Sequence, residues 1–274
     1  MVWADLHVHT AYSDGVHSIE ETVHFAKAQG IQAIAITDHD TVFHYEKVKA
    51  VCQQYGLETI RGVEMSCYDC DVHKKVHIVG LWLDEYPQYV EKLCQNTLQC
   101  RDCYHHEMIQ KLNQKGLDIT YEEAKQYAPY NIVFKMHLFM AIVHKYPEYN
   151  NLQKYRELFM EETSQDTDAK MGYIDVKEGI EAIRQDGGIA IIAHPCEYHN
   201  YDEIEKYVSY GLQGIEISHP SMEEEDYDLT QSFARKYNLL KSGGSDFHNI
   251  QLTPIGHHGL TKQQFMELKR QVNR

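Results

Sequence analysis

The sequence lacks any apolar run long enough to span a membrane. A transmembrane helix needs roughly 18 or more consecutive apolar residues, and no stretch of the 274 residues approaches that length. The first residues form a short apolar segment with no basic region ahead of it, so they do not resemble a signal peptide. Together these absences predict a cytoplasmic protein without a membrane partner.

Basic residues are also scarce. The chain has 26 Lys and Arg against 41 Asp and Glu, which gives a net charge of −15. Broad binding of duplex nucleic acid needs a basic face that neutralises phosphates, so no duplex partner is expected. A phosphorylated substrate is still compatible with this charge, because bound metal ions can supply positive charge locally.

The seven cysteines do not indicate a disulfide framework, because their number is odd and the expected compartment is reducing. Cys67 with Cys70, and Cys100 with Cys103, form two CxxC pairs of the kind found in structural zinc sites. The Gly-rich knuckles of zinc ribbons are missing, so structural zinc is one of two open interpretations. The other is simply a chain with many cysteines.

The most informative positive feature is a pair of histidines in the first apolar segment. His7 and His9 are two residues apart in a segment typical of a buried strand, so both should lie on one face. Asp14 follows five residues after His9. Two imidazoles and a carboxylate are suitable ligands for a divalent transition metal.

Further metal-type side chains stand where later strands are expected to end. Several buried strands would each carry an unpaired ionisable group, which is costly unless the groups share a partner. A common metal cluster removes that cost. The sequence therefore predicts that His7, His9 and Asp14 converge with His39, Glu64, His77, His194, Asp246 and His248.

The alternation of strands and helices over 1–84 and again over 172–260 predicts an α/β fold with a parallel sheet. Between about 85 and 170 the pattern becomes helical, with apolar residues at helical spacing such as Met108, Leu112, Leu138, Ile142 and Val143. We expect an all-helical insertion that forms a lid over the metal site. A stability module or a dimer contact is the alternative, and the oligomeric state is left open.

The ordered motifs resemble those of the PHP family, the polymerase and histidinol phosphatase phosphoesterases. The resemblance rests on His7 and His9, Asp14, TDHDT at 37–41, GVE at 62–64, His77, AHP at 193–195 and GSDFH at 244–248. It implies a distorted (β/α)7 barrel formed by 1–84 and 171–274, with 85–170 as the helical insertion. TDHDT and the insertion are more similar to the branch that acts on nucleotides and short RNA than to the histidinol phosphate branch.

The resemblance also implies three divalent metal ions, and the ligand types suit Mn²⁺, Fe²⁺ or Zn²⁺. His7, His9, Glu64 and Asp246 would hold the first ion, Asp14, His39 and His248 the second, and Glu64, His77 and His194 the third. A water bridging two such ions is ionised near neutral pH and can attack phosphorus, so no side-chain nucleophile is needed. Asp38 and Asp40 flank His39, and each is expected either to orient an imidazole or to shuttle a proton.

Substrate contacts are expected from the insertion. Lys135 and His137 match positions where the nucleotide-acting relatives carry an Arg and a His that contact phosphate, and Arg101 matches another basic position. Tyr104 and Glu197 stand where those relatives have basic residues, which are departures from the family pattern. Lys170 and Tyr173 are further candidates for the rim of the pocket, and their plainer interpretation is a solvated Lys and a packed Tyr.

These observations predict a trinuclear metal-dependent phosphoesterase that acts on small nucleotides or on the ends of short oligonucleotides. Two alternatives are a histidinol phosphate phosphatase and a metal-binding regulatory module without catalysis. The first is disfavoured by TDHDT and the insertion, and the second by the complete set of ligand positions.

Overall fold

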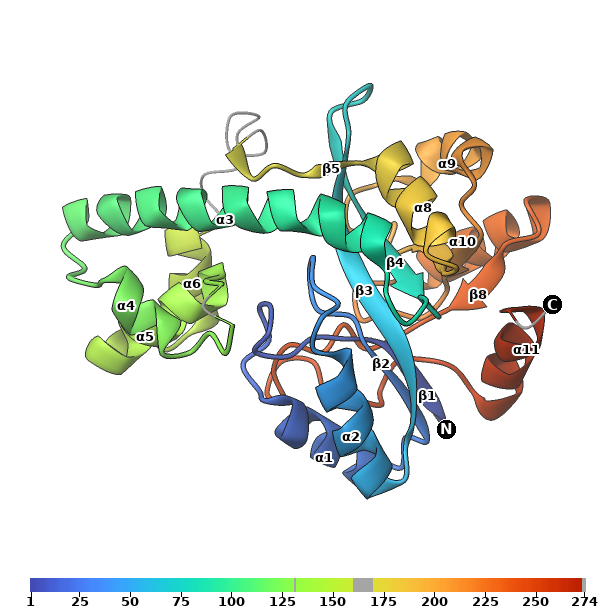
Figure 1. The fold of residues 1–274 in the computed structure, drawn as a ribbon, viewed down its shortest axis with the longest axis horizontal. Coiled ribbons are helices and arrows are strands. Elements are labelled where there is room, and N and C mark those ends of the chain that lie inside the picture. Colours follow the sequence, from blue (N-terminus) through green and yellow to red (C-terminus); the bar gives the residue numbers. More distant parts are fainter. Residues whose placement is uncertain (131, 160–169, 273–274) are drawn as a thin grey trace.

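The computed structural model describes residues 1–130, 132–159 and 170–272 (Figure 1). The strands are β1 (Ala4–Val8), β2 (Ala33–Ile36), β3 (Glu58–Asp69), β4 (Lys74–Leu81), β5 (Ile174–Asp175), β6 (Ile189–Ile192), β7 (Gly214–Glu216) and β8 (Leu240–Ser242). The barrel helices are α1 (Ile19–Ala28), α2 (Tyr45–Tyr55), α8 (Val176–Gln185), η2 (Tyr201–Glu203), α9 (Ile204–Tyr210), α10 (Glu224–Lys236) and α11 (Lys262–Val272). Between β4 and β5 lie α3 (Gln88–Gln114), α4 (Tyr121–Lys125), α5 (Lys135–Lys145), η1 (Pro147–Tyr149) and α6 (Leu152–Phe159).

The strands form one curled sheet in the order β1-β2-β3-β4-β6-β7-β8, with β5 paired to the outer end of β3. Most neighbours are parallel, but β4 runs antiparallel to both β3 and β6. This departure from an all-parallel sheet arises because a short turn, residues 70–73, connects β3 directly to β4, and such a connection reverses the chain. The α/β class and the distorted barrel expected from the sequence are confirmed.

The two edges of the sheet are linked through the segment that follows β8. The Leu6 N–H donates to the carbonyl of Gly243 (3.2 Å), and the His9 N–H donates to the carbonyl of Phe247 (2.8 Å). Gly244 is required at this junction, because a Cβ atom there would lie 2.4 Å from the backbone nitrogen of His7. The closure therefore brings the last sequence motif against the first.

Local signals in the sequence account for the helix ends near the site. Ser18 caps α1 by accepting from the Glu21 N–H (3.2 Å), and the Glu21 carboxylate accepts from the Ser18 N–H (2.9 Å), as the capping sequence predicts. Gly56 ends α2 in the left-handed conformation with φ +65°. Asp175 caps α8 by accepting from the Lys177 N–H (2.9 Å).

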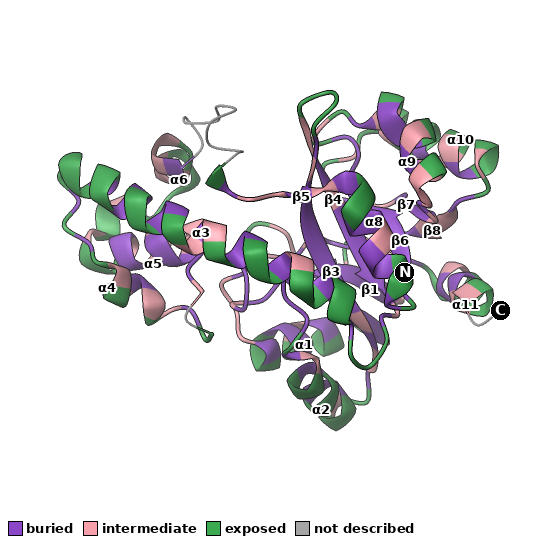
Figure 2. Cartoon of the chain, turned by 45° about the horizontal axis from the view of Figure 1, so that its top comes forward, coloured by how far each residue is buried: buried purple, intermediate pink, exposed green. Residues whose placement is uncertain are grey.

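Helices cover the sheet on its outer side, so the strands are buried along most of their length (Figure 2). The helices of the insertion have an apolar core of their own, which includes Met108, Leu112, Leu138 and Ile142. Near the start of α3, however, Val90 packs into the barrel core. Long α3 thus anchors the insertion to the barrel at one end and carries α4 to α6 at the other (Figure 1).

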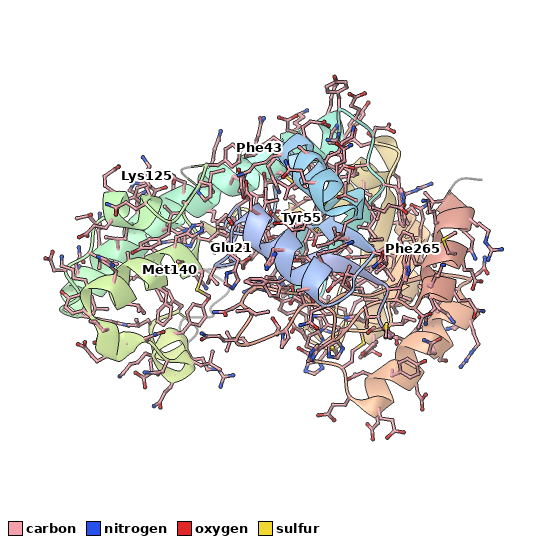
Figure 3. The ribbon with its side chains drawn as sticks, turned by 90° about the horizontal axis from the view of Figure 1, so that it is seen from below. Glu21, Phe43, Tyr55, Lys125, Met140 and Phe265 are labelled. Atoms are coloured by element: carbon pink, nitrogen blue, oxygen red, sulfur yellow. The ribbon has the colours of Figure 1, made fainter. Side chains whose placement is uncertain are left out.

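Seen from below, Lys125 and Met140 mark the insertion at one end of the molecule, and Phe265 on α11 marks the other (Figure 3). Glu21 and Tyr55 on α1 and α2 lie between them (Figure 3). None of the helices in the described ranges is both long enough and apolar enough to cross a membrane.

Asp5 anchors the segment that follows β8. Its carboxylate accepts from the Ser245 N–H (2.9 Å) and from the Gly256 N–H (3.3 Å). Burial raises the pKa of Asp5 to about 6, although these hydrogen bonds oppose the rise. Because this folded-state pKa exceeds the unfolded value of 3.8, the stability that Asp5 contributes is fully present below pH 3.8 and is lost as pH rises through 6.

We predict that Asp5→Asn removes this pH dependence. Two pKa units correspond to about 3 kcal/mol, so the free energy of unfolding of the chelator-treated wild type should fall relative to the variant by about that amount between pH 4 and 7. Urea unfolding at several pH values measures the difference. A difference in the free energy of unfolding that stays constant between pH 4 and 7 would contradict the prediction.

Candidate metal centre

All nine predicted ligands come together in the barrel, although Glu64 and His77 stand inside their strands and not at strand ends as expected. β1 supplies His7, and β3 and β4 supply Glu64 and His77. The remaining members stand in loops, namely His9 directly after β1, Asp14, His39, His194, Asp246 and His248. The loop residues Asp40 and Asp246 have φ values of +55° and +47°. Such left-handed backbone is unusual outside glycine and clusters at functional sites.

The first predicted set gathers around one oxygen of Glu64. His7 Nε2 and His9 Nε2 each lie 3.1 Å from Glu64 Oε2, and 3.4 and 3.1 Å from Asp246 Oδ1. The two ring nitrogens are only 3.2 Å apart, and the buried Asp246 Oδ1 makes no hydrogen bond within the described part of the chain. Buried nitrogen and oxygen donors that face a common point in this way suit a divalent ion.

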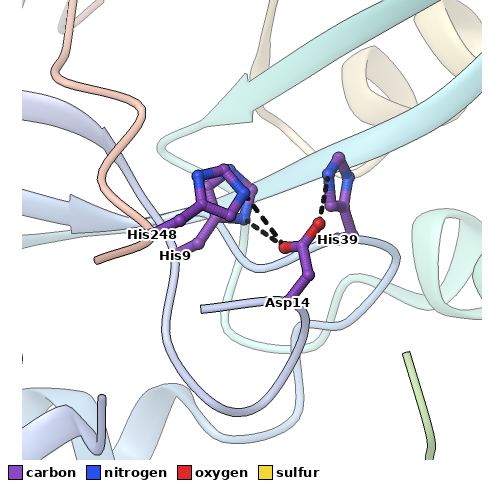
Figure 4. Close-up of side chains that lie close together, drawn as sticks. All are labelled: His9, Asp14, His39 and His248. Carbon is purple, nitrogen blue, oxygen red and sulfur yellow. Dashed lines mark ion pairs between the residues drawn. The ribbon is translucent and has the colours of Figure 1, made fainter. Parts of the chain in front are cut away.

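The second predicted set gathers around Asp14 (Figure 4). Asp14 Oδ1 lies 3.2 Å from His248 Nε2, and Asp14 Oδ2 lies 3.7 Å from His39 Nε2. His9, which the sequence assigns only to the first set, also reaches this group through its Nδ1, 3.6 Å from Asp14 Oδ1. His9 therefore stands between the two groups.

The third predicted set gathers around the other oxygen of Glu64. His77 Nδ1 lies 2.8 Å and His194 Nε2 2.9 Å from Glu64 Oε1. His39 Nδ1 approaches Oε2 at 3.3 Å. The two carboxylate oxygens of Glu64 thus face different histidines, as a bridging ligand requires.

The charges of the centre are mutually dependent. Burial alone would raise the pKa of Glu64, but the imidazoles of His39, His7 and His77 hold it well below its usual value. Burial lowers the pKa of His248, yet Asp14 and Asp246 raise it to about 10, and Glu64 raises that of His194 to about 9. Because metal ions compete with these protons, metal affinity should weaken in acid.

Glu216 is a member of the centre that sequence reasoning missed. Its buried carboxylate accepts from His7 Nδ1–H (2.9 Å) and from the His194 N–H (2.8 Å). The available signal was an acidic residue inside the buried strand segment at 214–217. A carboxylate behind a histidine fixes the tautomer and orientation of the ring, so that its Nε2 faces the centre.

His219 was also missed. It is buried, its Nε2 lies 3.3 Å from Asp246 Oδ2, and with Asp246 and Glu197 it forms a further group able to hold a cation. Glu197 accepts from the hydroxyl of Ser221 (2.7 Å). This chain thus places an acid beside the centre, where the family resemblance led us to expect a basic residue.

The two aspartates that flank His39 support loops. Asp38 accepts from the Thr10 N–H (2.7 Å) and from the Ser13 hydroxyl (2.7 Å), and it pairs with His44 Nε2 (2.8 Å). Ser13 Oγ in turn lies 3.3 Å from His9 Nδ1. Asp38 therefore reaches a predicted ligand through Ser13 rather than directly.

Asp40 links the centre to the insertion. Its carboxylate accepts from the Ser66 N–H (2.9 Å) and from Arg101 Nη2 (2.9 Å). The guanidinium of Arg101 also lies 4.5 Å from the centre of the Phe134 ring. Arg101 is thus nearly buried, and its Nε makes no hydrogen bond in the described structure.

The other basic residues expected to contact phosphate lie on α5. His137 is fully buried, its Nδ1 accepts from the Phe134 N–H (3.1 Å), and its Nε2 makes no hydrogen bond within the described ranges. Lys135 Nζ donates to the Phe159 carbonyl (3.2 Å). His105 on α3, which sequence reasoning missed, is the opposite tautomer, because its Nδ1–H donates to the Val133 carbonyl (2.6 Å). Its buried Nε2 is therefore an acceptor, and it makes no hydrogen bond within the described residues.

The remaining candidates, namely the two rim residues and the paired cysteines, do not form a common site. Lys170 pairs with Glu107 on the surface (2.6 Å), and Tyr173 lies beside Tyr68. Cys67 is buried, whereas Cys70 and Cys103 are exposed. Among residues 1–130, 132–159 and 170–272, no group able to hold a metal includes a cysteine, so the structure gives no support to structural zinc.

A cavity of about 270 Å³ opens beside the centre. Barrel and insertion both contribute to its wall. Burial, and then the nearby carboxylate of Asp14, raise the pKa of the Tyr155 phenol on α6. The lining residues include Asp14, Met136, Tyr155, His219, Asp246 and His248. The insertion therefore reaches the predicted ligands, as a lid would.

The fold and the centre define a metallohydrolase of the α/β class, and comparison with known families identifies it. The PHP domain profile matches residues 5–240, so the chain belongs to the PHP family. The chain is 32% identical to the phosphoribosyl 1,2-cyclic phosphate 1,2-diphosphodiesterase of Eggerthella lenta over 246 residues, which cover 89% of this chain and 93% of the relative.

A second relative supports this assignment, and a solved structure shares the fold. A 5'-3' exoribonuclease of Haemophilus influenzae is 31% identical over 249 residues, with 89% of each chain covered. A solved amidohydrolase structure from Chromobacterium violaceum, with bound sulfate and no metal, superposes with a TM-score of 0.81 at 23% identity, covering 97% of this chain and 96% of the other. The protein is thus an enzyme of the metal-dependent phosphoester hydrolase class.

We predict that Glu216→Gln weakens metal binding while the fold is retained. The amide cannot accept from both the His7 ring and the His194 backbone, so His7 loses its fixed orientation, and loss of such a partner typically lowers metal affinity roughly 10- to 100-fold. Competition with a chelator measures the affinity, and circular dichroism checks the fold. Glu225→Gln, an exposed change on α10, is the control, and equal affinities in both variants would contradict a role for Glu216 in orienting His7.

Proposed function

We propose that this protein is a trinuclear metal-dependent phosphoesterase that hydrolyses phosphoester bonds of small nucleotides or at the ends of short oligonucleotides. The observation that carries the proposal is the sharing of the Glu64 carboxylate. One of its oxygens faces His7 and His9, and the other faces His77 and His194. A carboxylate with partners on both sides is suited to bridge two ions.

The nine ligands divide among three positions. His7, His9, Glu64 and Asp246 would hold one ion, Asp14, His39 and His248 a second, and Glu64, His77 and His194 a third. Bound divalent ions supply positive charge that attracts phosphate oxygens and makes water acidic enough to act as a nucleophile near neutral pH. Mn²⁺, Fe²⁺ and Zn²⁺ all suit this mixture of imidazole and carboxylate.

The protein's own residues orient and enclose the reacting group. Glu216 fixes the ring of His7, and Asp38 fixes the loop that carries Asp14. The insertion contains two buried N–H groups, Arg101 Nε and His137 Nε2, that make no hydrogen bond in the described structure. Buried donors without partners are costly, and a phosphate oxygen would satisfy them.

Nucleotides and strand ends suit this arrangement better than long duplexes. The net charge of −15 provides no track for duplex DNA, and the cavity of about 270 Å³ suits a small group or a chain terminus. The similar Haemophilus influenzae protein is named as an exoribonuclease. Histidinol phosphate is the rival substrate, and nothing in the centre favours it.

The proposal predicts an order of substrates. The Mn²⁺-loaded protein should hydrolyse a nucleoside bisphosphate or a short RNA faster than histidinol phosphate, and it should not cut inside duplex DNA. Initial rates across these four substrates measure the order. Fastest turnover of histidinol phosphate would overturn the substrate assignment. His9→Ala should abolish hydrolysis and lower the metal content, and a fully active His9→Ala protein would overturn the metal centre.

The insertion generates a separate prediction. Lys135→Ala and His137→Ala should weaken the handling of phosphorylated substrates without releasing metal, because neither residue belongs to the ligand sets. A lost charge-assisted phosphate contact costs ~1.5–3 kcal/mol, a factor of roughly ten or more in kcat/KM. Lys145→Ala is the matched control on the same helix, since Lys145 pairs at the surface with Asp118 (2.9 Å). Unchanged kinetics in both test variants would make the insertion a stability or dimer element.

A further inference from the structure

The face of β3 that carries Glu64 continues outward beyond the metal centre. Alternation along a strand puts Glu64, Ser66 and Tyr68 on the same face. The antiparallel register pairs Ser66 with His77 and Tyr68 with Lys75, and residues directly opposite share a face. Tyr68 and Lys75 therefore lie one step, about 6.8 Å along the strands, beyond the pair that contains His77.

Tyr173 completes a small surface at this step. It directly precedes β5, which pairs with β3 at Cys67 and Tyr68. The rings of Tyr68 and Tyr173 are nearly parallel, with an interplanar angle of 9° and centroids 6.4 Å apart, and Lys75 Nζ lies 5.5 Å from the Tyr173 centroid. All three side chains are partly exposed. In Figure 1 this end of the β3–β4 hairpin projects from the body of the sheet, with β5 beside it.

Tyr198 connects this surface to the centre. Its ring centroid lies 5.0 Å from that of His77, and its hydroxyl lies 3.5 Å from His77 Nε2. Aromatic side chains thus lie both against a predicted metal ligand and one strand step beyond it, where the rings of Tyr68 and Tyr173 face each other.

The chemistry of Tyr68, Lys75 and Tyr173 matches a nucleotide. Proteins bind single strands by stacking bases on aromatic side chains, which tolerates any base, and by placing cations along the backbone. A lysine beside two tyrosines supplies both elements in a chain whose overall charge repels phosphate. The three side chains are partly exposed, so a base can approach them.

We propose that Tyr68, Lys75 and Tyr173 form a second nucleotide subsite. It binds the nucleotide next to the scissile end of a single strand: the tyrosines stack on its base, and the lysine contacts its phosphate. The inference rests on the proposed function and deepens it. A substrate with two or more nucleotides occupies the subsite, whereas a mononucleotide does not reach it.

The test compares Tyr173→Ala with wild type on two substrates, a nucleoside bisphosphate and an RNA trinucleotide. Loss of one stacked base should raise KM for the trinucleotide roughly five- to hundredfold and leave KM for the bisphosphate unchanged. Tyr173→Trp should restore trinucleotide KM, because the indole also stacks, and this rescue separates stacking from a folding defect. Tyr86→Ala, at an exposed tyrosine that precedes α3, is the control. Lys75→Gln should reduce the salt dependence of trinucleotide KM.

Equal effects of Tyr173→Ala on both substrates, or none on the trinucleotide, would overturn the subsite. If wild type hydrolyses neither substrate, the proposed function fails, and the subsite is then judged by binding alone. Fluorescence anisotropy of a 3'-labelled trinucleotide with Mn²⁺ present should show weaker binding to Tyr173→Ala than to Tyr86→Ala. Equal affinities in that assay would overturn the subsite independently of catalysis.

Discussion

The buried carboxylate of Glu64 is the constraint on which the rest of the site depends. It is 1% exposed and lies within 3.3 Å of a nitrogen on each of five imidazoles. A charge buried in this way is tolerable only when its partners are fixed around it. The barrel provides this fixation because β1 and β4, and the loops after β1, β2 and β6, bring their histidines to the same carboxylate on β3. The five imidazoles belong to His7, His9, His39, His77 and His194.

The loops beside the other ligands contain strained backbone, which contacts from outside the centre hold in place. Asp40 and Asp246 adopt left-handed backbone, which persists only where surrounding contacts determine it. Asp5 holds the loop of Asp246 through backbone N–H groups, and Arg101 holds Asp40 from the insertion. The insertion is therefore coupled to the centre in two ways, by the Arg101 pair and by the cavity wall that contains Tyr155. The barrel fixes the metal-type side chains, and the insertion shapes the space above them.

Much of this arrangement could be predicted from local patterns. The alternation of His7 and His9 on a short apolar strand predicted both imidazoles on one face. The other metal-type side chains were expected to join them, because a shared metal cluster removes the cost of burying unpaired ionisable groups. The capping box at Ser18 was equally local. Glu216, His219 and His105 escaped prediction because their partners are distant in sequence. Glu216, for example, bonds to His7 across 209 positions, and only the order of strands in the sheet brings them together.

The periods of strands and helices, the family and the set of nine side chains all follow from local patterns in the chain. Three features arise only on folding: the antiparallel run of β4 between β3 and β6, the choice of which Glu64 oxygen faces which histidine, and the pairing of Arg101 with Asp40. The physical reason is that alternation and capping act over a few neighbouring residues. Register, curl and ion pairing depend instead on how distant segments pack, and that packing is a property of the whole chain.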